Sequence, residues 1–128
     1  MDEQRFKRGV KVRREVLGDE YVDRALENVD EFTEQFQQLV SEFCWGEVWT
    51  DETLSRRERS ILNLGMTAAL GRMHEFEIHF RGALRNGLTP DELRAVLIQI
   101  AVYCGVPAGV DSFRSARRVL DEWGGGAN

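Results

Sequence analysis

Glu75 and His79 stand four residues apart in a stretch whose pattern predicts a helix. This spacing places a carboxylate and an imidazole on one helix face, about one turn apart. Histidine exchanges a proton near neutral pH, and a carboxylate beside it can orient one ring nitrogen and stabilise the imidazolium. The pair is therefore a candidate for general acid–base catalysis with His79 as the reacting group, although such pairs also occur as ordinary surface contacts. The other histidine, His74, lies off this face, and we expect it to be exposed.

Two arginines near the start of the same stretch are candidates for binding an anionic substrate. A guanidinium matches a carboxylate in bidentate geometry. Arg59 is the stronger candidate because it directly precedes the apolar run 61–70, and Arg57 lies nearby in the first turns. Each could instead be a solvated helix residue. Further along, Tyr103 stands just before Gly105, where a glycine permits backbone to approach a pocket closely, so Tyr103 is a candidate pocket residue.

The segment WGEVWTDET, residues 45–53, predicts a loop with two large aromatic anchors. Trp45 and Trp49 either plug the core or form the wall of a pocket. Glu47 between them is a further candidate carboxylate for a substrate site, or else a solvated or capping residue.

Helices must position these side chains, because no segment shows the two-residue alternation of a strand, and the fold class is therefore all-α. The helix beginning near residue 31 carries an apolar stripe that we expect in the core. The stripe consists of Phe32, Phe36, Leu39, Val40 and Phe43. The predicted helices span residues 3–17, 21–27, 31–44, 55–70, 73–86, 90–104 and 108–123.

The helix over residues 55–70 is apolar or small on nearly every side beyond Ile61, which predicts burial all round. Six or seven helices in a chain of only 128 residues cannot bury all of their apolar surface against one another. We therefore expect copies of the chain to pack together as an oligomer.

Composition narrows the possible functions. The length predicts a single helical domain over residues 1–123 followed by a flexible tail, 124–128. The net charge of −5 and the lack of a basic block disfavour nucleic acid as a partner. No run is long and apolar enough to predict a membrane span, and the charged N-terminus does not resemble a secretory signal, so we expect a cytoplasmic protein. No phosphate loop, dinucleotide fingerprint or zinc spacing occurs, so the sequence indicates neither a cofactor nor a metal site.

Several short motifs in order along nearly the whole chain resemble the γ-carboxymuconolactone decarboxylase family. The motifs are Leu17-Gly18-Asp19-x-x-Val22-Asp23, Trp45-Gly46-Glu47-Val48-Trp49-Thr50, Arg59-Ser60, Glu75-x-x-x-His79, Ala83-x-x-Asn86-Gly87 and Tyr103-Cys104-Gly105-Val106-Pro107-Ala108. The resemblance implies a compact alkylhydroperoxidase-D-like domain of six to seven helices that uses no cofactor and is usually hexameric.

The resemblance also implies a reaction: decarboxylation of 4-carboxymuconolactone to β-ketoadipate enol-lactone in bacterial protocatechuate breakdown. We then expect Trp45, Trp49 and Tyr103 to line the pocket. Arg59, with Arg57, would hold a substrate carboxylate. His79 would protonate carbon after carbon dioxide leaves, and Glu75 would orient His79 and keep it charged.

The chain departs from the pattern of its relatives at three places. Peroxidases of the same superfamily carry Cys-x-x-Cys-x-x-x-His, but here the cysteine positions hold Arg72 and Glu75, so their thiol chemistry is not available. The family usually reads Arg-Pro-Gly where this chain has Asp51-Glu52-Thr53, and His74 stands where a glutamate is common. These changes leave open a decarboxylase or isomerase of a related lactone, a thiol-peroxidase-fold protein without peroxidase activity, or a non-enzymatic assembly protein.

Overall fold

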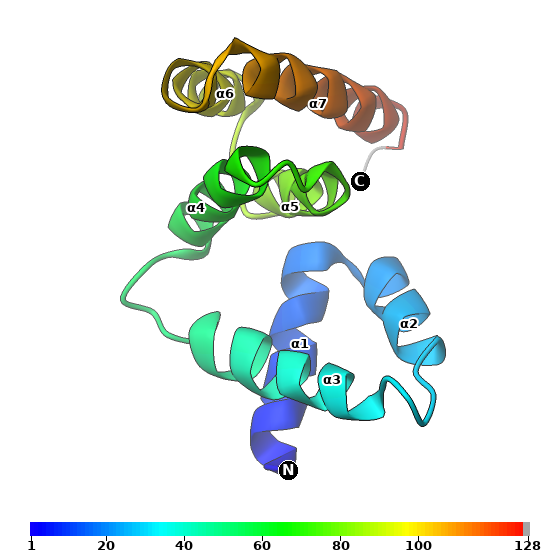
Figure 1. Ribbon diagram of the computed structural model, residues 1–128. Helices are drawn as coiled ribbons and strands as arrows, with labels where there is room; N and C mark the ends of the chain where they lie inside the picture. The colour runs from blue at the N-terminus through cyan, green and yellow to red at the C-terminus, as the bar shows by residue number, and fades with distance from the viewer. Residues whose placement is uncertain (127–128) are drawn as a thin grey trace. The chain divides into compact units, whose positions relative to one another are not determined.

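The helix signals correspond to helical segments in the computed structural model, which describes residues 1–126 (Figure 1). In chain order the segments are α1 (Glu3–Leu17), α2 (Asp19–Glu27), α3 (Glu34–Leu39), the π-helix η1 (Val40–Val48), α4 (Arg56–Ala69), α5 (Met73–Arg85), α6 (Pro90–Cys104) and α7 (Val106–Gly126). No strand occurs among the described residues, so the predicted all-α fold is confirmed.

The chain forms two compact units, Met1–Arg56 and Arg57–Asn128. The single domain over residues 1–123 stays a prediction. Of the predicted flexible tail, residues 124–126 continue helix α7, and residues 127–128 lie outside the described part of the chain.

In the first unit, α1 packs closely against η1 because both helices carry glycine at the crossing. A Cβ atom added to Gly9 would lie 1.8 Å from the carbonyl oxygen of Ser41. One added to Gly46 would lie 2.5 Å from the carbonyl oxygen of Arg5. Real Cβ atoms do not approach oxygen this closely, so the crossing requires glycine at both positions.

The tryptophans of the first unit are buried, with Trp45 3% and Trp49 6% exposed. Their rings stack with centroids 4.9 Å apart. The predicted loop over residues 45–53 is therefore partly wrong, because the helical segment continues through Val48. The reason is that burying both rings holds this part of the backbone in a helical, π-type turn.

The predicted core stripe after residue 31 is wrong for the chain by itself. Phe32 is 94% exposed, Phe36 62% and Phe43 50%. The helix also begins later than predicted, at Glu34, because Asp30 and Thr33 form a hydrogen-bonded turn before it. The periodicity correctly identified an apolar face, but this face is left open by the first unit.

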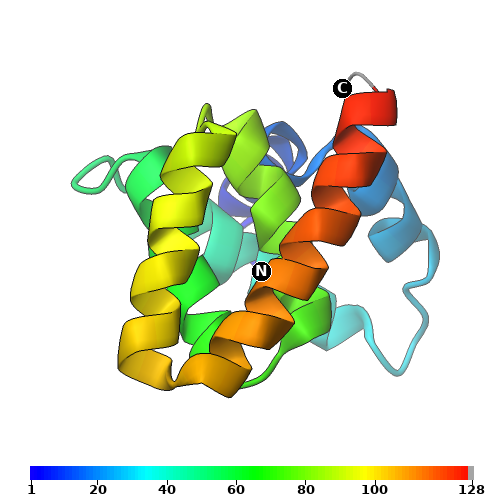
Figure 2. The ribbon, with the colours of Figure 1, turned by 90° about the horizontal axis from the view of Figure 1, so that it is seen from above.

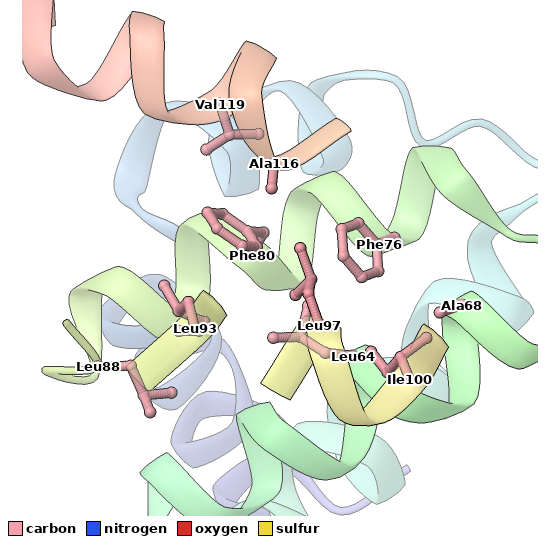
Figure 3. Packing of buried hydrophobic residues seen from close by; sticks show 11 residues of the cluster. Leu64, Ala68, Phe76, Phe80, Leu88, Leu93, Leu97, Ile100, Ala116 and Val119 are labelled. Carbon is pink, nitrogen blue, oxygen red and sulfur yellow. The ribbon is translucent and has the colours of Figure 1, made fainter. Parts of the chain in front are cut away.

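The second unit is built around a cluster of buried apolar side chains (Figure 3). Phe76 and Phe80 of α5 lie at its centre, with ring centroids 6.0 Å apart. Figure 3 shows Phe80 facing Ala116 and Val119 of α7. The cluster as a whole consists of Leu64, Ala68, Phe76, Phe80, Ala83, Leu88, Leu93, Leu97, Ile100, Ala116 and Val119.

Helix α4 contributes only one face to this core. Leu64 is fully buried, whereas Leu62 is 51% and Leu70 74% exposed. The prediction that this helix is buried all round is therefore wrong for a single chain, because the second unit covers one side of it.

The helix boundaries of the second unit follow the capping signals. Gly71, with φ of +72°, makes the turn between α4 and α5, a conformation that favours glycine. Thr89 and Glu92 form the predicted capping box at the start of α6. Gly105 then separates α6 from α7, and Figure 2 shows these two helices joined by a sharp turn.

Candidate active site

His79 lies on α5, directly before the fully buried Phe80 and about one turn after the fully buried Phe76. Its own side chain is only half-buried. Its Nδ1 atom is 3.4 Å from Nδ2 of Asn63 on α4. The ring is therefore held from a second helix, at a half-buried position. A histidine held in this way can present its other ring nitrogen, Nε2, to a ligand.

Electrostatics at His79 favour the neutral ring. Burial lowers the pKa of His79, and the negative charge of Glu75 opposes part of this shift. Glu75 is exposed, so water weakens its influence. Burial therefore has the larger effect in the free protein, and the role of Glu75 in keeping His79 charged stays a prediction.

Arg59 lies one helical turn before Asn63 and shares its face of α4. Side chains spaced in this way are about 5–6 Å apart at Cβ. Arg59 is half-buried, so its guanidinium is partly shielded from water. Helix α4 therefore places a cation on the same side as the residue that contacts His79.

Arg57 is engaged by the protein itself. One guanidinium nitrogen donates to the carbonyl oxygen of Gly87 and another to Glu92, each at 2.6 Å. The backbone N–H of Thr89, together with Arg57, holds the pKa of Glu92 below its usual range. These contacts tie α4 to the α5–α6 turn and give Arg57 a structural role.

Tyr103 lies apart from His79 within the second unit. It is 83% exposed and lines a hollow of about 240 Å³. The residues of α4 that line this hollow are Ile61 and Gly65, which lie on the opposite side of the helix from Asn63. His79 is not among the residues that line this hollow, and a pocket shared by Tyr103 and His79 stays a prediction.

Trp45, Glu47 and Trp49 belong to the first unit. Both stacked tryptophans are almost fully buried, as a packing plug would be, and their place in the wall of a substrate pocket stays a prediction. Trp49 also borders a hollow of about 500 Å³ in that unit, beside Arg8 and Lys11. Glu47 is exposed and lies 3.5 Å from Arg5.

Asn63 is the residue of this site that the sequence did not single out. A signal for it existed, because Asn63 follows Arg59 by four residues and would share its helix face. A second polar contact links α4 to the C-terminal end of α5, where Asn86, the residue after the helix, donates to the buried hydroxyl of Ser60 at 2.8 Å. Together the two contacts fix how α4 and α5 face each other.

Among residues 1–126, no three His, Cys, Asp or Glu side chains gather in a way that could hold a metal ion. In the same range, no helix has the length and apolar character needed to cross a membrane.

Comparison with known proteins gives a consistent set of relatives. The model of the carboxymuconolactone decarboxylase family matches residues 34–118. The chain is similar to 4-carboxymuconolactone decarboxylase of Acinetobacter baylyi, with 42% identity over 123 residues that cover 96% of this chain and 92% of the relative. A 4-carboxymuconolactone decarboxylase sequence from Pseudomonas putida is 46% identical over 48 residues, which is 37% of this chain and the full length of that sequence.

A relative with a different printed substrate is almost as similar. Nitrosuccinic acid decarboxylase npaB of Metarhizium robertsii is 39% identical over 117 residues, covering 91% of this chain and 82% of the relative. All three relatives are named as decarboxylases, but their names give two different acids as the substrate.

Proposed function

Because the chain belongs to the carboxymuconolactone decarboxylase family, we propose that it is a carboxy-lyase that converts 4-carboxymuconolactone to β-ketoadipate enol-lactone and carbon dioxide. The names of the two bacterial relatives support this choice of substrate. The reaction would be a step of protocatechuate catabolism, in the cytoplasm, and would need no cofactor.

The observation that carries the proposal is the position of His79, held by Asn63 on α4 with Arg59 one turn away. Loss of carbon dioxide leaves an electron pair on carbon, which an enolate or dienolate delocalises. Completing the reaction requires a proton at carbon, and a histidine can deliver it near neutral pH. Arg59 would bind a substrate carboxylate through charge-assisted hydrogen bonds.

The lowered pKa of His79 has a direct consequence for this mechanism. In the free protein the ring tends to be neutral, because burial disfavours the charged form. A bound dianion adds negative charge beside the ring, and a nearby negative charge raises the pKa of an imidazole. The acid form of His79 would therefore develop as the substrate binds.

A second candidate substrate is nitrosuccinic acid, which the name of the Metarhizium relative supplies. Its nitro group can also accept the electron pair left by carbon dioxide, so the same arginine and histidine would serve. The chain also has Asp51 where the family usually has arginine, and Asp51 is hydrogen-bonded to Thr53 in its own loop, at 2.7 Å from the hydroxyl. This change in the loop favours a substrate other than 4-carboxymuconolactone.

The two candidates are separated by assaying the purified protein with each acid. Carbon dioxide release is measured for both, together with the ultraviolet absorbance of the lactone. Turnover of 4-carboxymuconolactone with the higher kcat/KM supports the main proposal. A higher kcat/KM for nitrosuccinic acid supports the second, and no turnover of either acid by folded protein contradicts both.

We also propose that copies of the chain assemble, as a hexamer by resemblance to the family. The exposed apolar faces of α3, η1 and α4 support this proposal. Phe32, Phe36 and Leu39 are each more than half exposed in the single chain, at 94%, 62% and 52%. Large apolar side chains gathered on one face are typical of subunit contacts.

A further inference from the structure

We propose that Asn63 is a positioning residue that binds Nδ1 of His79 and so makes Nε2 the nitrogen that exchanges the proton with substrate. The inference rests on the proposed function, in which His79 is the acid. It starts from the 3.4 Å contact between Nδ2 of Asn63 and Nδ1 of His79.

The contact selects one form of the neutral ring. An amide N–H can donate to Nδ1 only if that nitrogen carries a lone pair, which places the single ring proton on Nε2. Free neutral imidazole populates both tautomers, so a fixed donor at Nδ1 shifts the population towards Nε2–H. Nδ1 is also the ring nitrogen nearer the backbone of α5, so Nε2 is the nitrogen that reaches further from the helix.

An asparagine suits both protonation states because its amide has a donor and an acceptor. In the neutral ring, Nδ2 of Asn63 donates to Nδ1. In the imidazolium, Nδ1–H donates to the Oδ1 atom of Asn63 after the amide turns. When the imidazolium protonates carbon, the Nε2–H bond breaks and a C–H bond forms, and the neutral ring keeps its remaining proton on Nδ1, still bonded to Oδ1.

The surroundings of Asn63 keep it in place. Helix α4 is fixed against the core through Leu64, which is fully buried. The hydroxyl of Thr67 donates to the backbone carbonyl of Asn63 at 2.7 Å. Glu75, on the same helix as His79, acts on the charge of the ring, and Arg59 lies one turn before Asn63 on α4.

The test is the tautomer of His79, read from ¹⁵N spectra of protein labelled at histidine, with no substrate present. The chain has two histidines, and the exposed His74 supplies an internal reference in the same spectrum. Above its pKa, wild-type His79 should show a larger Nε2–H fraction than His74. Asn63→Ala should bring the two fractions together.

Asn63→Asp is the second variant, because a carboxylate at this position only accepts hydrogen bonds. It should move the neutral ring to the Nδ1–H form and raise the pKa of His79. In turnover, Asn63→Ala should lower kcat by up to about 100-fold with little change in KM, as expected for a misplaced catalytic group. Asn63→Asp should recover part of that loss. Asn28→Ala, at an exposed asparagine in the first unit, is the matched control.

Equal tautomer fractions for His79 and His74 in the wild type would overturn the inference. So would an Asn63→Ala variant, folded by circular dichroism, with unchanged fractions and unchanged kcat. Because the spectra need no substrate, a wild type that turns over neither acid contradicts the proposed function separately, while the tautomer still reports on Asn63.

Discussion

Nδ2 of Asn63 lies 3.4 Å from Nδ1 of His79, so helix α4 supplies the polar partner of a ring carried by α5. The negative charge of Glu75, on the same helix as the ring, favours the imidazolium. The ring therefore responds both to a contact from α4 and to a charge on α5.

The first prediction concerns Glu75. Its negative charge favours the imidazolium, so Glu75→Gln should lower the pKa of His79 further below its already depressed position. An NMR titration of the two histidines would measure this shift. Glu77→Gln is a matched control, because Glu77 is paired with Arg118 at 2.6 Å and is not a source of the His79 shift. A pKa of His79 that rises or stays constant in Glu75→Gln would contradict the assigned influence.

The sequence could predict the helices of the second unit closely, because their signals are local. Gly71, Gly87 and the Thr89–Glu92 box each mark a boundary that depends on a few neighbouring residues. The Glu75–His79 pair was also visible, since it lies within one helix.

What the sequence could not predict depends on contacts between helices. The partner of Nδ1 comes from α4, sixteen positions away along the chain. The structural role of Arg57 depends likewise on Gly87 and Glu92, which a later turn brings to it. The exposure of the stripe that includes Phe36 was missed because periodicity reveals an apolar face but not what covers it.

The second prediction separates the two arginines. Arg59→Ala should lower kcat/KM by about 10- to 100-fold, the loss expected for a charge-assisted hydrogen bond to a carboxylate. Arg57→Ala should instead lower the melting temperature by a few degrees and leave kcat/KM of the folded protein nearly unchanged, because its partners are Gly87 and Glu92. Steady-state kinetics and calorimetry on both variants measure the contrast. The opposite result, with Arg57→Ala impaired in turnover and Arg59→Ala active, would reverse the assignment.

The third prediction tests the close crossing in the first unit. In Gly9→Ala the new methyl group would collide with the Ser41 carbonyl, 1.8 Å away, and force α1 from η1. We expect a destabilisation of about 1–3 kcal/mol or more. Gly65→Ala is the control, because a Cβ there meets nothing within 4 Å. It should stabilise α4 by about 0.5–1 kcal/mol, as alanine replaces glycine within a helix. Equal denaturation midpoints for the two variants would contradict the crossing geometry.

The fourth prediction concerns assembly. Phe36→Glu places a charge on the exposed apolar stripe and should reduce the oligomer to smaller species in light scattering after size exclusion. Gln4→Glu adds the same charge at an exposed residue of α1 that lies outside the stripe, and it should leave the oligomer largely intact. If the wild type is a monomer, or if Phe36→Glu assembles like the wild type, this face is not a subunit contact.

The measurement that tests the central claim most directly compares turnover of 4-carboxymuconolactone by the wild type, His79→Gln and His74→Gln. If His79 is the proton donor, His79→Gln should lose about 10²–10⁴ in kcat while its circular dichroism stays helical. His74→Gln should stay within a few-fold of the wild type, because His74 is exposed and lies off the Glu75–His79 face. Wild-type turnover by folded His79→Gln would contradict the account.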